Sequence, residues 1–473
     1  MLRRTLLATT AGLTLALTLG VAAFAAPTVI RVVLKDLVNS NPEDVAHIAR
    51  IEAGLKAQGH DIDVQIVDLP SDGYADKLTL MLLSGDIPDL IYFQGGDAQI
   101  AAQGILEDWR PWIEKSTFLK SAIWPHNVER LNNYPYLLYP WPARSKSALI
   151  RSDLLAATGL AAPNTLDEWT ELMRAVRKTD LDGDGVLNTY AIISPDNTAE
   201  LDAIFDKAFG ISASWLKNDA GEWVSARVSN EQRAKLAYYN MLYAEGLLDP
   251  EYITSNWEVK EDKFYTGKVG IVMGTAGTVV GIYETKIQAA HPGAELTLLT
   301  PPAGVMQGLQ SQDVSKESRG LAISTLSPNK DAVLAFIDYM ASPEGQMYER
   351  MGFEGTHYTR NGDAYVATPK LGEWYPRFIT DNPSAWTAPI NPLSPLAQGS
   401  LQQGVTYFTA DNSFVFPSEL AAQVDAAENL YKTAVFRFVS GELSVEKDWD
   451  AFVANWNAAG GKAMTDYART VLK

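Results

Sequence analysis

Three aspartates at alternate positions carry the clearest chemical signal in this sequence. Asp180, Asp182 and Asp184 are followed at once by Gly185 and then by Val186. This spacing is typical of a loop that binds a hard cation, with carboxylates at positions one, three and five, a glycine turn at six and a main-chain carbonyl at seven. Three carboxylates this close repel one another unless a cation lies between them. We therefore predict a calcium site with the ligands Asp180, Asp182, Asp184, Val186 and Asn188.

The loop differs from a complete EF-hand. A full EF-hand has glutamate at position twelve, where this chain has Ala191, and positions nine and ten are Asn188 and Thr189. The loop lies between a helix and a strand expected at Tyr190, so we predict that the ion has a structural role. The alternative is a solvated acidic turn that binds no ion.

The elements that position these residues alternate between strands and helices. In residues 77–93, apolar positions at helical spacing precede Gly85, and a proline separates that helix from an apolar stretch of strand length. Strands expected at 28–34 and 64–69 flank a helix with Asn41 as its N-cap. This β-α-β-α-β order predicts a parallel sheet covered by helices, so the fold class is α/β.

The acidic loop itself follows a helix with a well-marked start. Thr165 is its predicted N-cap, and Glu168 three residues later completes a capping box. Further along the chain, residues 267–273 are expected to form a buried strand.

Residues 1–25 have the parts of a secretory signal peptide. Two arginines precede an apolar segment, and Ala23 and Ala25 stand where a signal peptidase requires small side chains, so we expect cleavage before Ala26. A membrane anchor is the alternative. The chain has no cysteine, so we expect a periplasmic protein without disulfides or a lipid anchor. Its formal net charge of −18 argues against nucleic acid or an anionic membrane as a partner.

Several motifs resemble one protein family, in the same order along almost the whole chain after residue 25. The stretch Leu83-Ser-Gly-Asp-Ile-Pro-Asp89 resembles a signature of family 1 extracellular solute-binding proteins, the receptors of ABC importers. Residues 163–169 and 264–273 are similar to two further family segments. Residues 342–358 resemble the branch of alginate-oligosaccharide-binding and lipoprotein-type sugar receptors.

The resemblance implies a two-lobed periplasmic-binding-protein fold (type II), with the ligand in a cleft between the lobes. It implies an N-terminal lobe of residues 26–143 and 322–355 and a C-terminal lobe of residues 144–321 and 356–473. It also implies a receptor that is not an enzyme, that closes around an oligosaccharide and that delivers it to the permease subunits of an ABC transporter. We expect this receptor to be a monomer.

A sugar receptor stacks aromatic rings on sugar faces and offers polar groups to the hydroxyls. The chain has 12 tryptophans and 20 tyrosines, most of which we expect in the core. Candidates in turns, at crossovers and in irregular segments are fewer, and many sugar-binding relatives have a stacking tryptophan where this chain has Thr275. The predicted ligand contacts are Tyr92, Gln94, Asp97, Trp141, Arg144, Trp257, Thr275, Trp374, Tyr375 and Trp386.

Two other functions remain open from the sequence. A secreted glycan-active hydrolase or lyase is one, although the chain has neither H-E-x-x-H nor G-x-S-x-G. The same fold with a peptide- or lipid-type ligand is the other.

Overall fold

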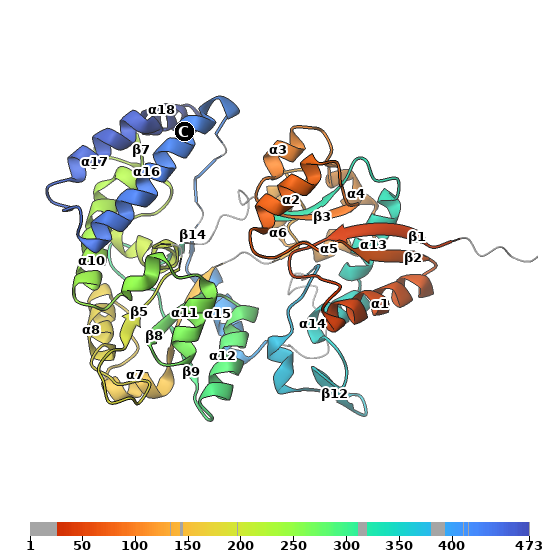
Figure 1. The fold of residues 1–473 in the computed structure, drawn as a ribbon, viewed down its shortest axis with the longest axis horizontal. Coiled ribbons are helices and arrows are strands. Elements are labelled where there is room, and N and C mark those ends of the chain that lie inside the picture. The colour runs from red at the N-terminus through yellow and green to blue at the C-terminus, as the bar shows by residue number, and fades with distance from the viewer. Residues whose placement is uncertain are drawn as a thin grey trace, which may run out of the picture.

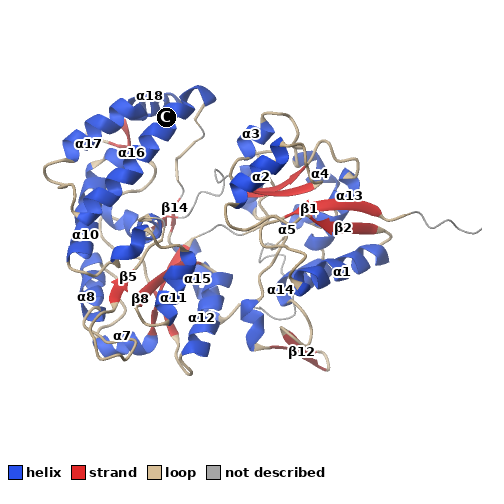
Figure 2. Ribbon diagram, in the orientation of Figure 1, coloured by secondary structure: helices blue, strands red, loops and turns tan. Residues whose placement is uncertain are grey.

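The elements of the chain form two lobes, each built on a four-stranded sheet (Figures 1 and 2). The computed structural model describes residues 26–132, 134–141, 145–195, 197–310, 319–379, 393–409, 411–414 and 416–472. The predicted signal peptide, residues 1–25, lies outside these ranges. Within them, no helix combines the length and the apolar character that crossing a membrane requires.

The first lobe contains a mixed sheet with the strand order β11-β3-β1-β2. Its first three strands in the chain are parallel and β11 is antiparallel to β3. In Figure 1, β1 runs from the outer end of the first lobe toward the second lobe, so the carboxyl ends of the parallel strands point at the gap between the lobes. The strands are β1 (Thr28–Val33), β2 (Ile62–Ile66), β3 (Leu90–Gln94) and β11 (Arg319–Ile323).

Helices cover both faces of this sheet. Alternate strand residues enter two apolar clusters, since Val32 packs with α1 and α13 whereas Val33 packs with α2. The predicted helix, turn and strand of residues 77–93 are confirmed as α2 and β3. The predicted N-cap Asn41 is also confirmed, because its side chain accepts a hydrogen bond from the amide of Glu43. The helices are α1 (Pro42–Ala57), α2 (Tyr74–Leu83), α3 (Asp97–Ala101), α4 (Arg110–Lys115), α5 (Leu119–Ala122), α6 (Pro125–Arg130), α13 (Lys330–Ala341) and α14 (Pro343–Met351).

The second lobe contains a sheet with the strand order β5-β8-β4-β9. β8 begins two residues later than the predicted strand, because Gly267 has φ +78° and ends the turn that follows α11. The strands of this sheet are β4 (Lys146–Arg151), β5 (Tyr190–Ile192), β8 (Val269–Thr275) and β9 (Leu296–Leu299). Shorter pairs are β6 (Trp215–Lys217) with β7 (Trp223–Ser225), β10 (Leu309–Gln310) with β14 (Phe408–Thr409), and β12 (Tyr358–Asn361) with β13 (Ala364–Ala367).

The second sheet also lies between two apolar clusters. Ile271 and Met273 of β8 pack on one face with α8 and α10, whereas Val272 packs on the other face with α12. The capping box at Thr165 and Glu168 is confirmed at the start of α8. The helices are α7 (Ser152–Thr158), α8 (Leu166–Val176), α9 (Ala199–Phe205), α10 (Asn230–Ala244), α11 (Trp257–Tyr265), α12 (Thr278–Ala290), α15 (Pro395–Thr406), α16 (Ala421–Ser440), α17 (Trp449–Trp456) and α18 (Lys462–Val471).

Going along the described residues, the chain changes lobe between residues 141 and 145, between 310 and 319, and between 379 and 393. β11 crosses the boundary that the sequence places between residues 321 and 322, and all five of its residues pair with β3. Phe378 and Ile379 belong to an apolar cluster of the first lobe. We therefore propose a first lobe of residues 26–141 and 319–379, with the rest of the described chain in the second.

Candidate functional site

The carboxyl end of β3 carries the first group of predicted ligand residues. Gln94 Nε2 donates a hydrogen bond of 3.1 Å to the hydroxyl of Tyr92. Trp141, the last described residue before the first crossing, contacts Tyr92 edge to face, with ring centroids 5.3 Å apart. All three side chains are partly exposed, so they form an aromatic and amide surface at the end of the first sheet that points at the second lobe.

Asp97 begins α3 at the same end of the sheet and is only 1% exposed. Its Oδ2 accepts a hydrogen bond of 3.1 Å from the hydroxyl of Tyr136, whereas Oδ1 is buried and has no partner in the described part of the chain. Burial raises the pKa of Asp97, and the bond from Tyr136 opposes that shift. Trp141 Nε1 is likewise buried without an acceptor among the described residues. A buried acceptor and a buried donor that both lack partners are suited to a ligand hydroxyl.

The second lobe places a polar group at its own facing edge. Thr275, the last residue of β8, pairs with Lys146, the first residue of β4. Lys146 Nζ donates to Glu200 at 2.6 Å, and Lys260 Nζ donates to both oxygens of the same carboxylate at 3.1 and 3.0 Å. Because β4 follows the first crossing directly, this edge lies where the chain arrives from the first lobe.

Sequence reasoning missed Glu200 and Lys260 as members of this group. They lie on α9 and α11, and nothing in their local sequence distinguishes them until both helices pack beside β4 and β8. Trp257, a predicted ligand contact, begins α11 one turn before Lys260 and is 56% exposed. The ring of Trp257 is too exposed to be part of an apolar core, and it begins the helix that carries Lys260. This position is compatible with stacking on a ligand.

Two predicted contacts lie in a different environment. Trp374 is 4% exposed, its Nε1 donates to the carbonyl of Glu349 at 2.7 Å, and its ring contacts His47 and Phe353 edge to face. These contacts account for Trp374 as part of the first-lobe core, so it is removed from the candidate ligand set. Tyr375 is 49% exposed, and its carbonyl accepts from Arg377.

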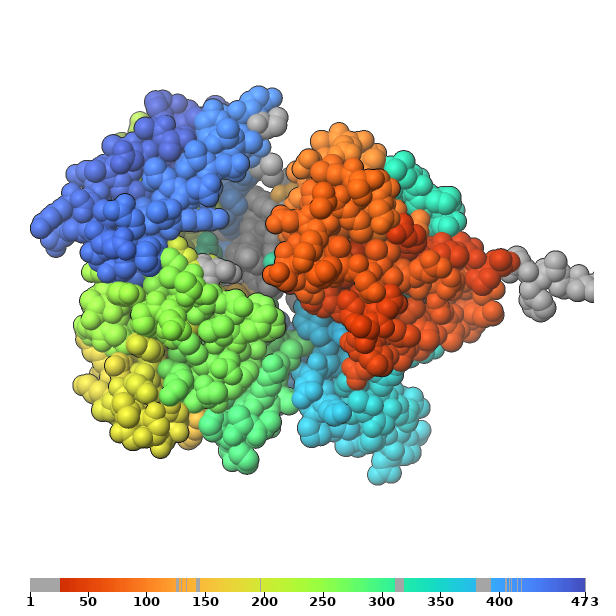
Figure 3. Space-filling model, in the orientation of Figure 1, coloured from red at the N-terminus to blue at the C-terminus, as the bar shows by residue number. Residues whose placement is uncertain are grey.

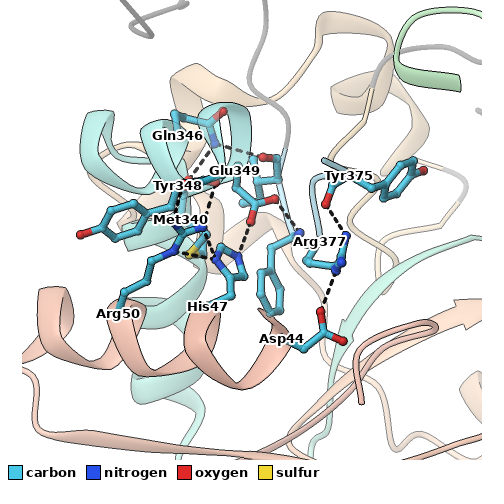
Figure 4. A network of polar contacts seen from close by, with 12 residues as sticks. Asp44, His47, Arg50, Met340, Gln346, Tyr348, Glu349, Tyr375 and Arg377 are labelled. Carbon is cyan, nitrogen blue, oxygen red and sulfur yellow. Dashed lines mark hydrogen bonds and ion pairs between the residues drawn. The ribbon is translucent and has the colours of Figure 1, made fainter. Parts of the chain in front are cut away.

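Trp374 borders a buried polar network that joins α1, α14 and the segment that follows Trp374 (Figure 4). His47 and Glu349 are hydrogen-bonded, with Nε2 and Oε1 2.9 Å apart, and both side chains are fully buried. Arg50 Nε donates to His47 Nδ1 at 3.0 Å, so the histidine carries its proton on Nε2 and donates it to Glu349. The second oxygen of Glu349 accepts from the amide of Phe378 at 2.8 Å. Burial lowers the pKa of His47, and the bond to Glu349 opposes that shift.

The remaining predicted ligand contacts cannot be placed. Arg144 and Trp386 lie outside the described residues. Figure 3 shows the two lobes apart in the upper part of the view and meeting in the lower part, where α12 packs against residues 369–373. Two hollows on the described surface lie on the second lobe, one near Arg151 and His291 and one near Lys217 and Arg469, and neither of these two is lined by a predicted ligand residue.

The acidic loop between α8 and β5 brings its carboxylates together. Asp180, Asp182 and Asp184 each offer an oxygen within 4.8 Å of the others. Asp180 accepts from the amides of Gly183 and Gly185 at 2.9 and 2.8 Å, which holds the turn in shape. Asn188, at loop position nine, has a buried Oδ1 without a partner among the described residues. Three clustered carboxylates and an orphaned amide oxygen are donors that suit calcium.

Comparison with known proteins gives consistent matches along most of the chain. A family profile described as "Bacterial extracellular solute-binding protein" matches residues 43–347. The lipoprotein LipO of Bacillus subtilis (strain 168) is 23% identical over 85% of this chain and 84% of its own. The polygalacturonan/rhamnogalacturonan-binding protein YtcQ of the same organism is 22% identical over 85% of this chain and 83% of its own.

Solved structures resemble the whole fold. The alginate-binding protein AlgQ2, in a crystal structure without calcium ion, covers 94% of this chain and 98% of its own with a TM-score of 0.67 and 16% identity. An EF-hand mutant of the Streptococcus pneumoniae ABC-transporter substrate-binding protein FusA, in complex with fructo-nystose, has the same coverage and TM-score at 15% identity. The predicted α/β, two-lobed periplasmic-binding-protein fold is confirmed.

Proposed function

Because this chain belongs to the family of bacterial extracellular solute-binding proteins, we propose that it captures an oligosaccharide between its lobes and delivers it to an ABC importer. The family consists of binding proteins, so the chain is not an enzyme. Relatives named for polygalacturonan and rhamnogalacturonan and for fructooligosaccharide support a saccharide as the ligand.

One observation carries this proposal. The end of the first sheet has a partly exposed Tyr92–Trp141 ring pair, together with a buried Asp97 oxygen and a buried Trp141 N–H for which the described residues supply no hydrogen-bond partner. Rings suit the flat faces of sugars, and unpartnered donors and acceptors suit their hydroxyls. Thr275, Lys146 and the exposed Trp257 would form the opposite wall.

Lobe closure would couple capture to delivery. A ligand that contacts both walls stabilises the closed state by its greater affinity for closed over open protein, and the transporter then recognises the closed form. We propose that Tyr92, Gln94, Asp97, Trp141, Trp257 and Thr275 contact the ligand. Arg144, Tyr375 and Trp386 remain further candidates, and the permease subunits and a monomeric state remain part of the proposal.

A thermal-shift panel tests the proposal. The protein without residues 1–25 is heated with neutral fructooligosaccharides, oligogalacturonides, oligopeptides and fatty acids, each at millimolar concentration. A saccharide at 100 times its Kd should stabilise the protein by about 2.7 kcal/mol, which is a rise of several degrees in Tm. A shift with a peptide or lipid alone would refute the saccharide assignment.

The saccharide that gives the shift then tests the site by titration calorimetry. Trp141→Ala should weaken binding at least tenfold, because it removes a stacking ring and an N–H donor together. Tyr365→Ala is the matched control, since Tyr365 contacts Tyr358 in the β12–β13 pair, well away from β3 in Figure 1. Equal affinities of the two variants would refute the proposed first wall.

We also propose calcium as a structural ion of the acidic loop. Asp180, Asp182, Asp184, the Val186 carbonyl and Asn188 would hold it, and the ion would neutralise the clustered carboxylates. The AlgQ2 structure without calcium ion and the EF-hand mutant of FusA support such a site in relatives of the chain. Calorimetry on chelator-treated protein tests it, and no heat at millimolar calcium would refute it.

Export is the last part of the proposal. The signal-like residues 1–25 and the absence of cysteine support cleavage before Ala26 and a periplasmic protein without a lipid anchor. N-terminal sequencing of the protein recovered from its native host tests this. An intact N-terminus in a membrane fraction would refute it.

A further inference from the structure

A lysine lies against the acidic loop, and the topology of the second sheet puts it there. The loop leads directly into β5, and Lys268 immediately precedes β8. Parallel pairing of the two strands aligns Tyr190 with Val269, and the amide of Tyr190 donates to the carbonyl of Lys268 at 2.9 Å. The start of β8 therefore has to lie beside the end of the loop.

A glycine allows the two segments to approach closely. Gly267 has φ +78°, and a Cβ at this position would come within 2.9 Å of the carbonyl oxygen of Leu181 in the loop. Only glycine adopts this conformation without strain and leaves that space open. The backbone next to Lys268 therefore lies against the backbone of Leu181 and Asp182 in the loop.

The side chain of Lys268 forms ion pairs with two of the three carboxylates. Its Nζ donates to Asp182 Oδ2 and lies 3.6 Å from Asp184 Oδ2. The lysine is 45% exposed, whereas Asp182 is 11% exposed, so the ammonium covers the most buried carboxylate of the loop. The hydrogen bond from Lys268 lowers the pKa of Asp182. The third carboxylate, Asp180, is already bonded by two backbone amides.

We infer that Lys268 is the built-in counter-ion of the acidic loop, and that calcium binds only by displacing its ammonium from Asp182 and Asp184. The inference rests on the proposed calcium site and concerns its regulation. An ammonium and a calcium ion compete for the same two carboxylates, and two cations held between those carboxylates would repel each other. The ammonium is tethered, so it competes at a high effective concentration. Position twelve of the loop is Ala191, which is buried in β5, so no acidic side chain there adds to the attraction for calcium.

This arrangement has two consequences. The loop keeps its shape without metal, because the lysine supplies the positive charge that the three carboxylates need. Calcium binding is weakened by the ammonium, so the site responds only to high calcium concentrations.

Calcium titration of four variants of the protein without residues 1–25 tests the inference. The variants are the unchanged sequence, Lys268→Met, Lys268→Arg and Lys56→Met. Lys56 pairs with Asp61 on the surface of the first lobe, so Lys56→Met removes the same charge far from the loop. Lys268→Met should bind calcium about tenfold more tightly or better than the unchanged protein. Lys268→Arg and Lys56→Met should remain within about twofold.

Thermal unfolding in EDTA provides a second measurement. Lys268→Met should melt lower than Lys56→Met in EDTA, and calcium should restore its Tm, whereas the unchanged protein should be little affected by either condition.

Calcium binding that is equally tight in the unchanged protein and Lys268→Met would overturn the inference and leave the calcium site standing. Absence of binding in all four variants would overturn both. An unfolded Lys268→Met that calcium does not rescue would also overturn the inference, because displacement by calcium requires that the metal can replace the lysine.

Discussion

Replacing Glu349 with alanine should destabilise the first lobe far more than an ordinary surface change. The Glu349 carboxylate is fully buried and accepts from His47 Nε2 at 2.9 Å and from the amide of Phe378 at 2.8 Å (Figure 4). Alanine would leave both donors without an acceptor. It would also leave the guanidinium of Arg50, which bonds to His47, without the nearest negative charge.

The magnitude follows from these contacts. Each buried donor left without a partner costs about 1–3 kcal/mol, and Glu349→Ala leaves two such donors, so the total cost is about 2–6 kcal/mol. We expect a loss of about 4 kcal/mol in the free energy of unfolding of the first lobe. For a unit of this size that corresponds to a fall in Tm of roughly 8–16 °C.

Differential scanning calorimetry of the protein without residues 1–25 measures this loss. Glu344→Ala is the matched control, because Glu344 lies on the same helix, is exposed and accepts a hydrogen bond from the hydroxyl of Tyr348. The control should change stability by about 0.5 kcal/mol or less. If Glu349→Ala melts within two degrees of Glu344→Ala, the buried network does not hold the lobe together and the reasoning is wrong.

Three further predictions concern stability. The pKa of His47 is below its ordinary value in the folded protein, so the unfolded chain takes up a proton at about pH 6.5 and the folded protein does so only at lower pH. The free energy of unfolding is therefore highest above that pH and falls as the pH drops below it. His47→Gln should flatten this pH dependence in Tm measurements between pH 7.5 and 5.5. Lys235 is buried and bonds to Asp202 and Asp206, so Lys235→Met should cost about 3–5 kcal/mol in urea unfolding, and a loss below 1 kcal/mol would contradict the buried pair. Gly267→Ala should cost about 1–2 kcal/mol, since alanine would be strained at φ +78°, and an unchanged urea midpoint would show that the turn relaxes freely.

Local signals in the sequence were sufficient for the elements that depend on neighbouring residues. Asn41, Thr165 and Glu168 mark their helix starts by side-chain chemistry that acts within three residues. The helix and strand of residues 77–93 follow from the apolar spacing and from Gly85. This glycine has φ +89°, a left-handed conformation that terminates a helix. The clustering of the three loop aspartates also follows from their spacing alone.

Contacts between distant segments were beyond the sequence. Trp374 lies in an irregular segment with exposed neighbours, but α1 and α14 close over it and make it a core residue. Lys268 gives no sign of its ion pair, because only the pairing of β5 with β8 places it next to Asp182. Glu200 and Lys260 meet for the same reason, when two helices pack beside one strand edge.

The late position of β11 in the chain has a consequence for folding. β11 is the edge strand that completes the first sheet, and the bond from Trp109 Nε1 to the carbonyl of Leu321 spans 212 residues. All of residues 145–310 must be synthesised before this strand exists. During that time the edge of β3 is open to wrong partners, and the long sequence separation slows correct pairing. The first lobe, although it begins the chain, therefore completes its sheet only after all four strands of the second lobe's sheet have been synthesised.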